Sequence, residues 1–527
     1  MALRGLGRAR LRRAAGSRSG VVLLAVALCL AGGAASTWPA LRHADGAFLA
    51  ASAGAPGAVA PGDHLQSAYQ LWLPGHRLAR GDAPWRDPYS FAPYTEPRVT
   101  FAGWPFALAF GPLQALVGTV AAWNLLVLLS YAGAGIATVA WLRALRVPPA
   151  AALVGGLAFA LAPYRVAQLA LGHQLALVAL LLPFALLALE RRRVWLAAAV
   201  LASIPLSGQV HLALGAIPFV AAYAALRPSD GLRAGARRAA AVALPSVAAG
   251  VVVWALVIRG SLGAGGRSFA QVEQYSAEPA DFVARASEAT ETVVLLGWLT
   301  PLLAVAGLAL HALIRPRLAL LLGIGAIVPV LLALGANLPG YEQLWETLPG
   351  LRDTRVPGRF LPIGALCIAA LAALALQRAP RAVALAALAL VAVDLRAGVD
   401  LFEAAPADPG NRVYAARPPQ ALLLELPLYL PDRHEGSVYQ YYALQAPGPR
   451  YGGYSTVAPK EVDGRLRELK PFECGARGRE YPEWVLVHRA LYASRTRCLG
   501  RLLEGLSRMG YREVARDPQL VLYRLDG

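Results

Sequence analysis

Residues 172–207 read GHQLALVALLLPFALLALERRRVWLAAAVLASIPLS, with three arginines between two apolar segments. Apolar segments of this kind recur along the first four hundred residues, and about 20 helical residues suffice to cross a bilayer. The pattern predicts a mainly α-helical, polytopic transmembrane bundle. We place about eleven spans, with boundaries good to about two to four residues, at 20–41, 120–142, 150–162, 172–189, 194–207, 209–226, 239–258, 292–313, 318–335, 359–377 and 382–401.

The arginines fall in every second break between these spans, and cytoplasmic loops collect Lys and Arg. The breaks contain Arg4 to Arg18, Arg143/Arg146, Arg191 to Arg193, Arg227 to Arg238, Arg315/Arg317 and Arg378/Arg381. Eleven crossings then give a cytoplasmic N-terminus and an extracytoplasmic C-terminus. Residues 1–35 also have the composition of a signal peptide, but the odd count favours an uncleaved first span. Because the arginines are dispersed and form no single basic face, the net charge of +18 indicates topology and not a nucleic-acid partner.

Three outer loops are longer than plain connectors, and long loops are usually functional or disordered. They cover 42–103, 259–291 and 336–358. The apolar segment 104–118 is short and broken by Pro105 and Pro112, so we expect an interfacial or re-entrant helix that extends the first outer loop region over 42–119. The domain prediction is therefore a transmembrane domain at 1–402 and a second domain at 403–527.

The polar tail from about Glu403 predicts a small extracytoplasmic α/β domain. Strand-like runs cover 421–428, 484–488, 511–515 and 520–525, and 498–509 has helical periodicity. Cys474 and Cys498 lie in this tail and could pair if it faces an oxidising compartment. Spacing alone does not decide whether they do.

Asp63 opens a polar stretch, Gly62-Asp63-His64, early in the first outer loop. A carboxylate just outside a membrane can act as a general base that deprotonates an acceptor hydroxyl. The alternative is that Asp63 caps a helix that begins at His64, since Asp is a favoured N-cap residue. The two roles are compatible, and capping is the more common one for such a residue.

Two groups of cationic and polar side chains suggest a bound anion. Arg165, His173 and Gln174 flank the outer ends of adjacent spans, and ionisable residues at membrane depth are functional candidates by default. The alternative for this group is that Arg165 reaches to the interface and His173 packs under a loop. Three further arginines lie within eight residues at an outer boundary, where a phosphate would match their guanidinium forks; they are Arg352, Arg355 and Arg359. Pairing with Asp353 is the alternative for one of them.

The chain resembles the membrane glycosyltransferases of the GT-C superfamily, in a poorly characterised bacterial branch with an extracytoplasmic C-terminal α/β domain. The resemblance covers the layout of the membrane region and rests on motifs of modest specificity that occur in a specific order. They are Gly62-Asp63, AFALAPYR at 158–165 leading to Gly172-His173, RVPGRF at 355–360, LELP at 424–427 and Gly453-Tyr454-Ser455.

The resemblance implies a glycosyltransferase of the bacterial cytoplasmic membrane. Its donor would be a polyprenyl-phosphate-linked sugar, its acceptor a lipid or glycan of the cell envelope, and Asp63 its general base on the outer face. Many relatives carry a second acid beside this base, where the present chain has His64, with Asp82 and Asp87 further along. Whether the protein requires a divalent metal therefore stays open. No metal-ligand spacing or nucleotide-binding fingerprint stands out in the sequence.

Two other classes of function compete with this interpretation. A lipid or polysaccharide flippase would explain many spans, but it would place charges along the membrane interior, and these spans are almost free of charge. A non-catalytic assembly factor of the cell envelope would keep the layout with a degenerate site.

Overall fold

The computed structural model describes residues 18–52, 58–264, 267–285, 290–396, 401–408, 411–478 and 480–526. Contacts divide the chain into two compact units. The helical unit comprises Met1–Arg42, Asn124–Val252 and Arg267–Glu403, and the mixed unit comprises His43–Trp123, Val253–Gly266 and Ala404–Gly527. Each unit is described by itself.

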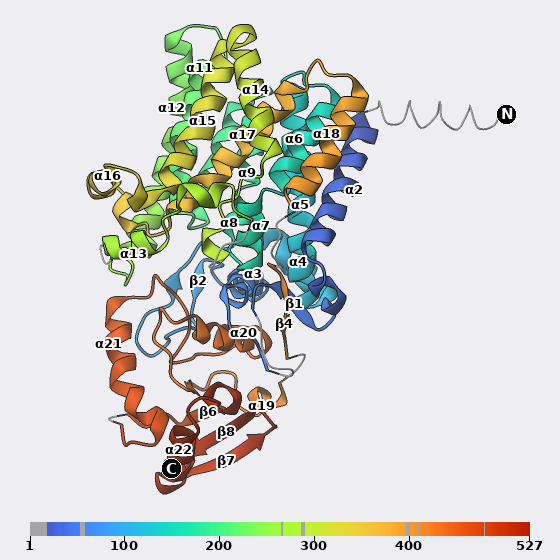
Figure 1. Ribbon diagram of the computed structural model, residues 1–527. Coiled ribbons are helices and arrows are strands. Elements are labelled where there is room, and N and C mark those ends of the chain that lie inside the picture. Colours follow the sequence, from blue (N-terminus) through green and yellow to red (C-terminus); the bar gives the residue numbers. More distant parts are fainter. Residues whose placement is uncertain are drawn as a thin grey trace, which may run out of the picture. The chain divides into compact units, whose positions relative to one another are not determined.

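The helical unit contains a helix in each of the eleven predicted spans, which confirms the mainly α class (Figure 1). These helices are α2 (Arg18–Ser36), α5 (Thr119–Ala144), α6 (Pro149–Ala160), α8 (Leu175–Val178) with α9 (Leu181–Glu190), α10 (Val194–Leu206), α11 (Val210–Leu226), α12 (Leu232–Val253), α14 (Leu299–Ile314), α15 (Pro316–Ala333), α17 (Leu361–Ala375) and α18 (Arg381–Asp394). α7 (Pro163–Ala170) follows α6 after a bend of 41°.

Five of the described helices are long and apolar enough to cross a membrane, and the bent pair α6–α7 makes six if it is one span. Several others are shorter apolar helices of 10–17 residues. The chain is a multi-pass membrane protein, while the count of eleven crossings stays a prediction. The long helices or helix segments are Ser19–Ser36, Thr119–Ala144, Leu232–Ile258, Pro316–Ala333 and Pro357–Ala375.

α17 is largely buried, and it packs against α6, α14 and α15 (Figure 1). Small residues let the helices approach closely, as is usual for helix packing in membranes. A Cβ added at Gly307 of α14 would lie 2.0 Å from the carbonyl oxygen of Leu371, so only glycine fits there without movement of the backbone.

The mixed unit contains strands and helices from the first outer loop and the tail. α3 (Asp63–Ala79) packs against α4 (Ala107–Val117), the predicted interfacial segment, and against α20 (Ser437–Gln445) of the tail. β1 (Ala47–Ala50) pairs with β4 (Glu403–Pro406), and β2 (Arg86–Asp87) pairs with β3 (Arg98–Val99). The predicted domain boundary near residue 402 stays a prediction, while contacts group the first outer loop with the tail.

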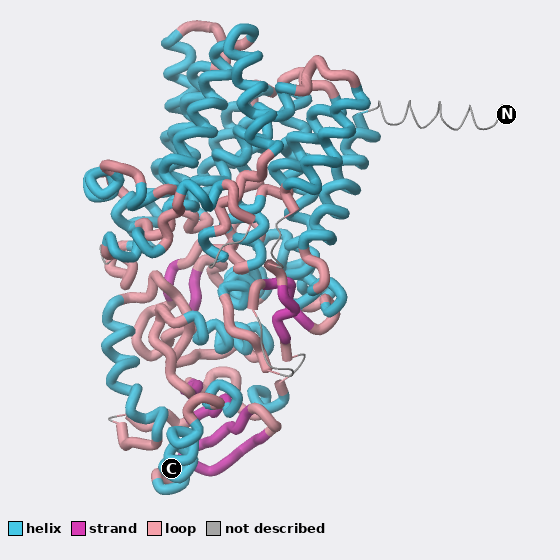
Figure 2. The backbone as a smooth tube through the Cα atoms, in the orientation of Figure 1, coloured by secondary structure: helices cyan, strands magenta, loops and turns pink. Residues whose placement is uncertain are grey.

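The tail carries a four-stranded sheet in the order β5-β6-β8-β7, which confirms the strands expected there (Figure 2). β5 (Leu423–Leu426) is parallel to β6 (Trp484–His488), and β8 (Leu520–Leu525) is antiparallel to both β6 and β7 (Tyr511–Arg516). α22 (Thr496–Arg508) places Leu502 and Leu506 in the core formed with this sheet. α21 (Lys460–Leu469) contributes Val462 and Leu466 to the same core.

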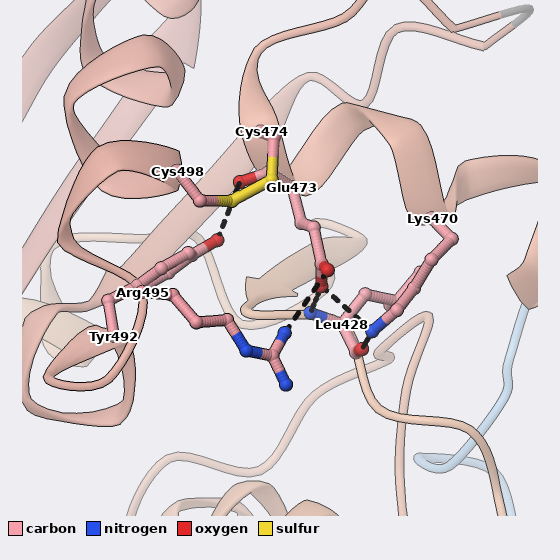
Figure 3. Close-up of a disulfide and its surroundings, with 7 residues drawn as sticks. All are labelled: Leu428, Lys470, Glu473, Cys474, Tyr492, Arg495 and Cys498. Carbon is pink, nitrogen blue, oxygen red and sulfur yellow. Dashed lines mark hydrogen bonds and ion pairs between the residues drawn. A yellow bond between two sulfur atoms is a disulfide. The ribbon is translucent and has the colours of Figure 1, made fainter.

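A disulfide joins Cys474 and Cys498, which resolves the pairing that spacing left open (Figure 3). Beside it, the Glu473 carboxylate accepts hydrogen bonds from Lys470 Nζ at 2.9 Å and Arg495 Nη1 at 3.2 Å. The backbone N–H of Leu428 donates to the same carboxylate at 3.1 Å. The disulfide and the Glu473 carboxylate thus connect the start of α22 to the segment that follows β5.

Candidate functional site

The break between α6 and α8 gathers polar side chains in the helical unit. Gln168 lies on α7, and Gly172 takes a positive φ of 81° in the turn that ends it. This turn places the His173 ring beside Gln168, with Nδ1 2.7 Å from Oε1. The turn that ends α7 therefore brings an imidazole and an amide together within a mostly apolar part of the chain.

Glu291 is an acid that joins this turn to the arginine-rich segment. Its Oε1 lies 3.1 Å from Arg359 Nη2 and 3.8 Å from His173 Nδ1. The carboxylate is largely buried, with a side-chain exposure of 17%. Its Oε2 is buried without a hydrogen-bond partner in the described parts of the chain. Burial alone would raise the pKa of Glu291, but the charges of Arg359 and His173 outweigh burial and hold this pKa below its usual range.

The RVPGRF segment holds Arg359 at this place through a tight turn. Pro357 begins a short 3-10 helix, Pro357–Phe360, that leads directly into α17. A Cβ at Gly358 would lie 3.2 Å from Cε2 of Tyr164, so the glycine lets this turn press against the tyrosine ring. The proline and the glycine therefore set the position from which Arg359 reaches Glu291.

Further cationic groups surround the ion pair. Arg355 lies over the ring of Tyr275, with its Cζ 5.6 Å from the centroid, and its charge acts on Glu291. His211, at the start of α11, lies within electrostatic range of three arginines. The Glu291 cluster, as named below, consists of Gln168, His173, His211, Arg267, Glu291, Arg355 and Arg359.

An apolar pocket in the same unit shares Tyr164 with the surroundings of this cluster. The Tyr164 ring lines the pocket, and the charges of Glu291 and Arg359 act on its hydroxyl. The remaining lining is almost entirely aliphatic, from Ala158, Ala162, Pro163, Leu295, Leu296, Thr300, Leu361, Ala365, Ile368 and Leu395. Tyr164 thus lies between the charged cluster and an apolar part of the same unit.

The structure brings His173, Arg355 and Arg359 of the predicted residues together. Arg165 is buried and donates from Nη1 to the carbonyl of Ala160 at 2.9 Å and from Nη2 to that of Ser130 at 2.8 Å. Gln174 is buried at the start of α8. Arg352 is exposed on the short helix Leu351–Asp353. Ligand binding by these three residues remains a prediction.

Asp63 lies in the mixed unit as the first residue of α3, and the helix is capped by Gly62 without a side-chain bond. The capping interpretation of Asp63 is therefore wrong, because the helix begins one residue earlier than expected. The backbone N–H of Gly62 donates to Ser437 Oγ of the tail at 3.0 Å, which fixes this helix start. Asp63 itself is half-buried, and its negative charge suits the helix N-terminus.

The neighbouring candidates for proton transfer differ from Asp63 in their surroundings. His64 is buried against Phe48, with ring centroids 5.3 Å apart, and burial lowers its pKa to about 3. Asp87 is buried and accepts from the Tyr69 hydroxyl at 2.7 Å and from Arg98 Nη2 at 3.3 Å. Asp82 pairs with Arg77 at 2.9 Å and has a side-chain exposure of 41%.

Sequence reasoning missed Glu291, Gln168 and Arg267 as members of the cluster. Glu291 carries no local motif and ends a loop, so only its contacts in space single it out. Within the described residues, no group of three or more His, Cys, Asp or Glu side chains is placed to hold a metal ion, and metal dependence stays untested.

No family model matches the sequence, and no curated protein matches it. Solved structures are similar in fold. Arabinofuranosyltransferase AftD from Mycobacteria, in two classes of its R1389S mutant, superposes with TM-scores of 0.58 and 0.55 at 16% and 18% identity. These matches cover 96% and 93% of this chain but 41% of AftD, so the chain spans about two fifths of that protein. ArnT from Cupriavidus metallidurans in the apo state superposes with a TM-score of 0.52 at 15% identity, over 96% of this chain and 98% of ArnT. These superpositions show that the chain shares the fold of AftD and ArnT, which is the GT-C fold expected from the sequence.

Proposed function

We propose that the chain is an integral membrane glycosyltransferase that moves a sugar from a polyprenyl-phosphate-linked donor to a cell-envelope acceptor on the outer face. The observation that supports this most is the Glu291 cluster beside the pocket shared by Tyr164. A lipid-linked phosphate carries an anionic group, and the arginines of the cluster match that charge. Guanidinium groups bind phosphate oxygens through charge-assisted hydrogen bonds.

Arg355 and Arg359 are the proposed phosphate ligands. Both lie on the segment between the helices Leu351–Asp353 and α17, and both act on Glu291. Each guanidinium offers several donors in a fixed fork, while an ammonium is only a point charge. We infer that His173 and Gln168 provide further polar contacts to the phosphate or to the sugar attached to it.

Asp63 is the proposed general base. As the acceptor oxygen attacks the sugar carbon, the hydroxyl proton passes to the Asp63 carboxylate. The bond between the sugar carbon and the phosphate oxygen breaks, and polyprenyl phosphate leaves with its electron pair. Attack opposite the leaving group inverts the configuration at that carbon. Among the neighbouring candidates, His64 is too weak a base at neutral pH because its pKa lies near 3.

The Cys474–Cys498 bond supports an extracytoplasmic tail, because disulfides persist in oxidising compartments. This is the orientation that the arginine pattern predicts, with a cytoplasmic N-terminus, and the resemblance implies the inner membrane of a bacterium. The bacterial cell envelope on the outer side would then supply the lipid or glycan acceptor.

Binding of a defined donor tests this function directly. The purified protein in lipid nanodiscs would be titrated with farnesyl-phosphoryl glucose, and Arg355→Ala and Arg359→Ala would be compared with the wild type. We expect each variant to bind about tenfold to hundredfold more weakly, since a hydrogen bond to a charged group contributes about 1.5–3 kcal/mol. Arg381→Ala, at an exposed arginine that begins α18, is the matched control and should bind normally.

The outcome against the proposal is equally defined. Wild-type protein that binds no lipid phosphate, or variants that bind as well as the wild type, would remove the cluster from the donor site. Donor binding without any transfer to membrane-extract acceptors would instead favour a non-catalytic envelope protein.

A further inference from the structure

Glu291 is a carboxylate set among positively charged side chains that are proposed to bind an anion. Its Oε1 contacts Arg359 at 3.1 Å and faces His173 at 3.8 Å, and the charge of Arg355 also acts on it. An acid in this position lowers the affinity of the cluster for every anion. Such a placement requires a reason beyond anion binding, which the arginines alone would provide more strongly.

Charge balance suggests what the acid does. Arg267, Arg355 and Arg359 carry three positive charges within range of His211, and Glu291 removes one of them. Its repulsion acts once on a singly charged phosphodiester and twice on a diphosphate with two charges. The acid therefore disfavours the doubly charged ligand more strongly, and this difference is a form of selectivity.

We propose that Glu291 determines which class of lipid phosphate this site accepts, by favouring the singly charged phosphodiester of a lipid-monophosphate sugar over a doubly charged lipid-diphosphate sugar. The inference rests on the proposed function, in which the cluster binds the donor phosphate. Burial strengthens the effect, because a side chain with 17% exposure is poorly screened by solvent. Glu291 is a specificity-determining residue in this scheme and takes part in no covalent step.

The size of the selectivity follows from one pair of unit charges. At a separation of roughly 6–8 Å and an effective dielectric constant of about 40, midway between a partly buried and a hydrated pair, one such interaction changes affinity about sixfold to tenfold. Removing the charge of Glu291 should help a doubly charged ligand by two such factors and a singly charged ligand by one. The ratio of the two affinities should therefore change by about sixfold to tenfold.

Two probes that differ in charge and carry no sugar isolate this effect. They are the methyl ester of farnesyl phosphate, with one charge, and the P2-methyl ester of farnesyl diphosphate, with two. Their dissociation constants would be measured with the full chain in nanodiscs of neutral lipid. In Glu291→Gln, which keeps the shape of the side chain, we expect the ratio to shift sixfold to tenfold toward the diphosphate ester.

Two variants separate charge from structure. Glu291→Asp keeps the charge and should keep most of the wild-type preference. Glu342→Gln removes an exposed acid of α16 (Tyr341–Thr347) and should leave the ratio unchanged. If Glu291→Gln fails to fold, Glu291→Ala removes the same charge with a smaller side chain and should shift the ratio in the same direction.

The results separate this inference from the function on which it rests. Wild-type protein that binds neither ester would contradict the proposed donor site and, with it, the role of Glu291. Wild-type protein that binds the esters, together with a ratio that stays within twofold of the wild-type value in a folded variant without the Glu291 charge, would overturn only the selectivity assigned to Glu291.

Discussion

Replacement of Asp63 by Asn distinguishes a catalytic carboxylate from a structural one. Asn keeps the size of the side chain and removes its basicity and charge. Because Gly62 occupies the N-cap position and no side chain caps α3, the exchange breaks no capping bond. The loss of a negative charge in the first turn of α3 contributes a structural cost of about 0.3–1 kcal/mol.

The catalytic cost should be much larger than this structural cost. A positioned general base accelerates proton transfer about 10²- to 10⁴-fold, which corresponds to about 2.7–5.4 kcal/mol in the activation barrier. Asp63→Asn should thus transfer sugar at least a hundredfold more slowly, while its unfolding temperature falls by only a few degrees. Asp82→Asn is the matched control, since Asp82 is partly exposed and pairs with Arg77 at the surface.

The assay is single-turnover release of polyprenyl phosphate from a radiolabelled donor in the presence of a membrane-extract acceptor. Donor binding is measured in parallel, because loss of a base should lower the rate and leave the dissociation constant nearly unchanged. A transfer rate for Asp63→Asn within threefold of the wild type would refute the assignment of Asp63. Equal losses of rate and of donor binding would indicate a structural role.

Three further predictions concern topology and stability. Cysteines introduced into the tail should react with an impermeant reagent in intact cells. Cysteines introduced into the loops 143–149, 190–193, 227–238 and 378–381 should not react. Protection of the tail from the reagent would contradict the predicted topology. Cys498→Ser should lower the free energy of unfolding of the mixed unit by about 3.5 kcal/mol, because the disulfide with Cys474 closes a loop with a sequence separation of 24. Denaturant titration measures this change. An unchanged free energy of unfolding would show that the disulfide does not form. Burial lowers the pKa of His64 to about 3 in the folded chain, while the ordinary pKa of this side chain is 6.5, so below pH 6.5 the unfolded chain binds a proton that the folded chain does not. The free energy of unfolding should therefore decrease by about 2 kcal/mol between pH 6.5 and 5. His64→Asn should make thermal stability less dependent on pH in this range.

The fold was predictable because the membrane leaves few choices. Spans must be apolar and helical over the thickness of a bilayer, and the segments 120–142 and 318–335 coincide with α5 and α15 within a few residues. The tail strands were predictable for a related reason, since 484–488 and 520–525 are short apolar runs between turns, and both form strands. Local sequence determines these elements directly.

The site was only partly predictable because its contacts join distant parts of the chain. Arg359 and Glu291 are separated by 68 positions, and neither sequence context indicates the other. Arg165 shows the opposite difficulty. An arginine beside a span suggests a ligand, yet its guanidinium donates to the backbone carbonyls of Ala160, at the end of α6, and Ser130 of α5. Pairing in space, which a single sequence does not display, decides both cases.

The packing of α3 against α20 has a consequence for how the protein is made. The first outer loop is synthesised early, but its partner helix follows roughly 350 residues later. At about 5–20 residues per second, α3 waits about 20–70 s for the surface that will cover it. The apolar side of α3, with Leu65 and Leu71 among its buried residues, stays uncovered by α20 during that interval. The nascent loop is therefore a natural client for a folding chaperone, and slow translation of the later spans would lengthen its exposure.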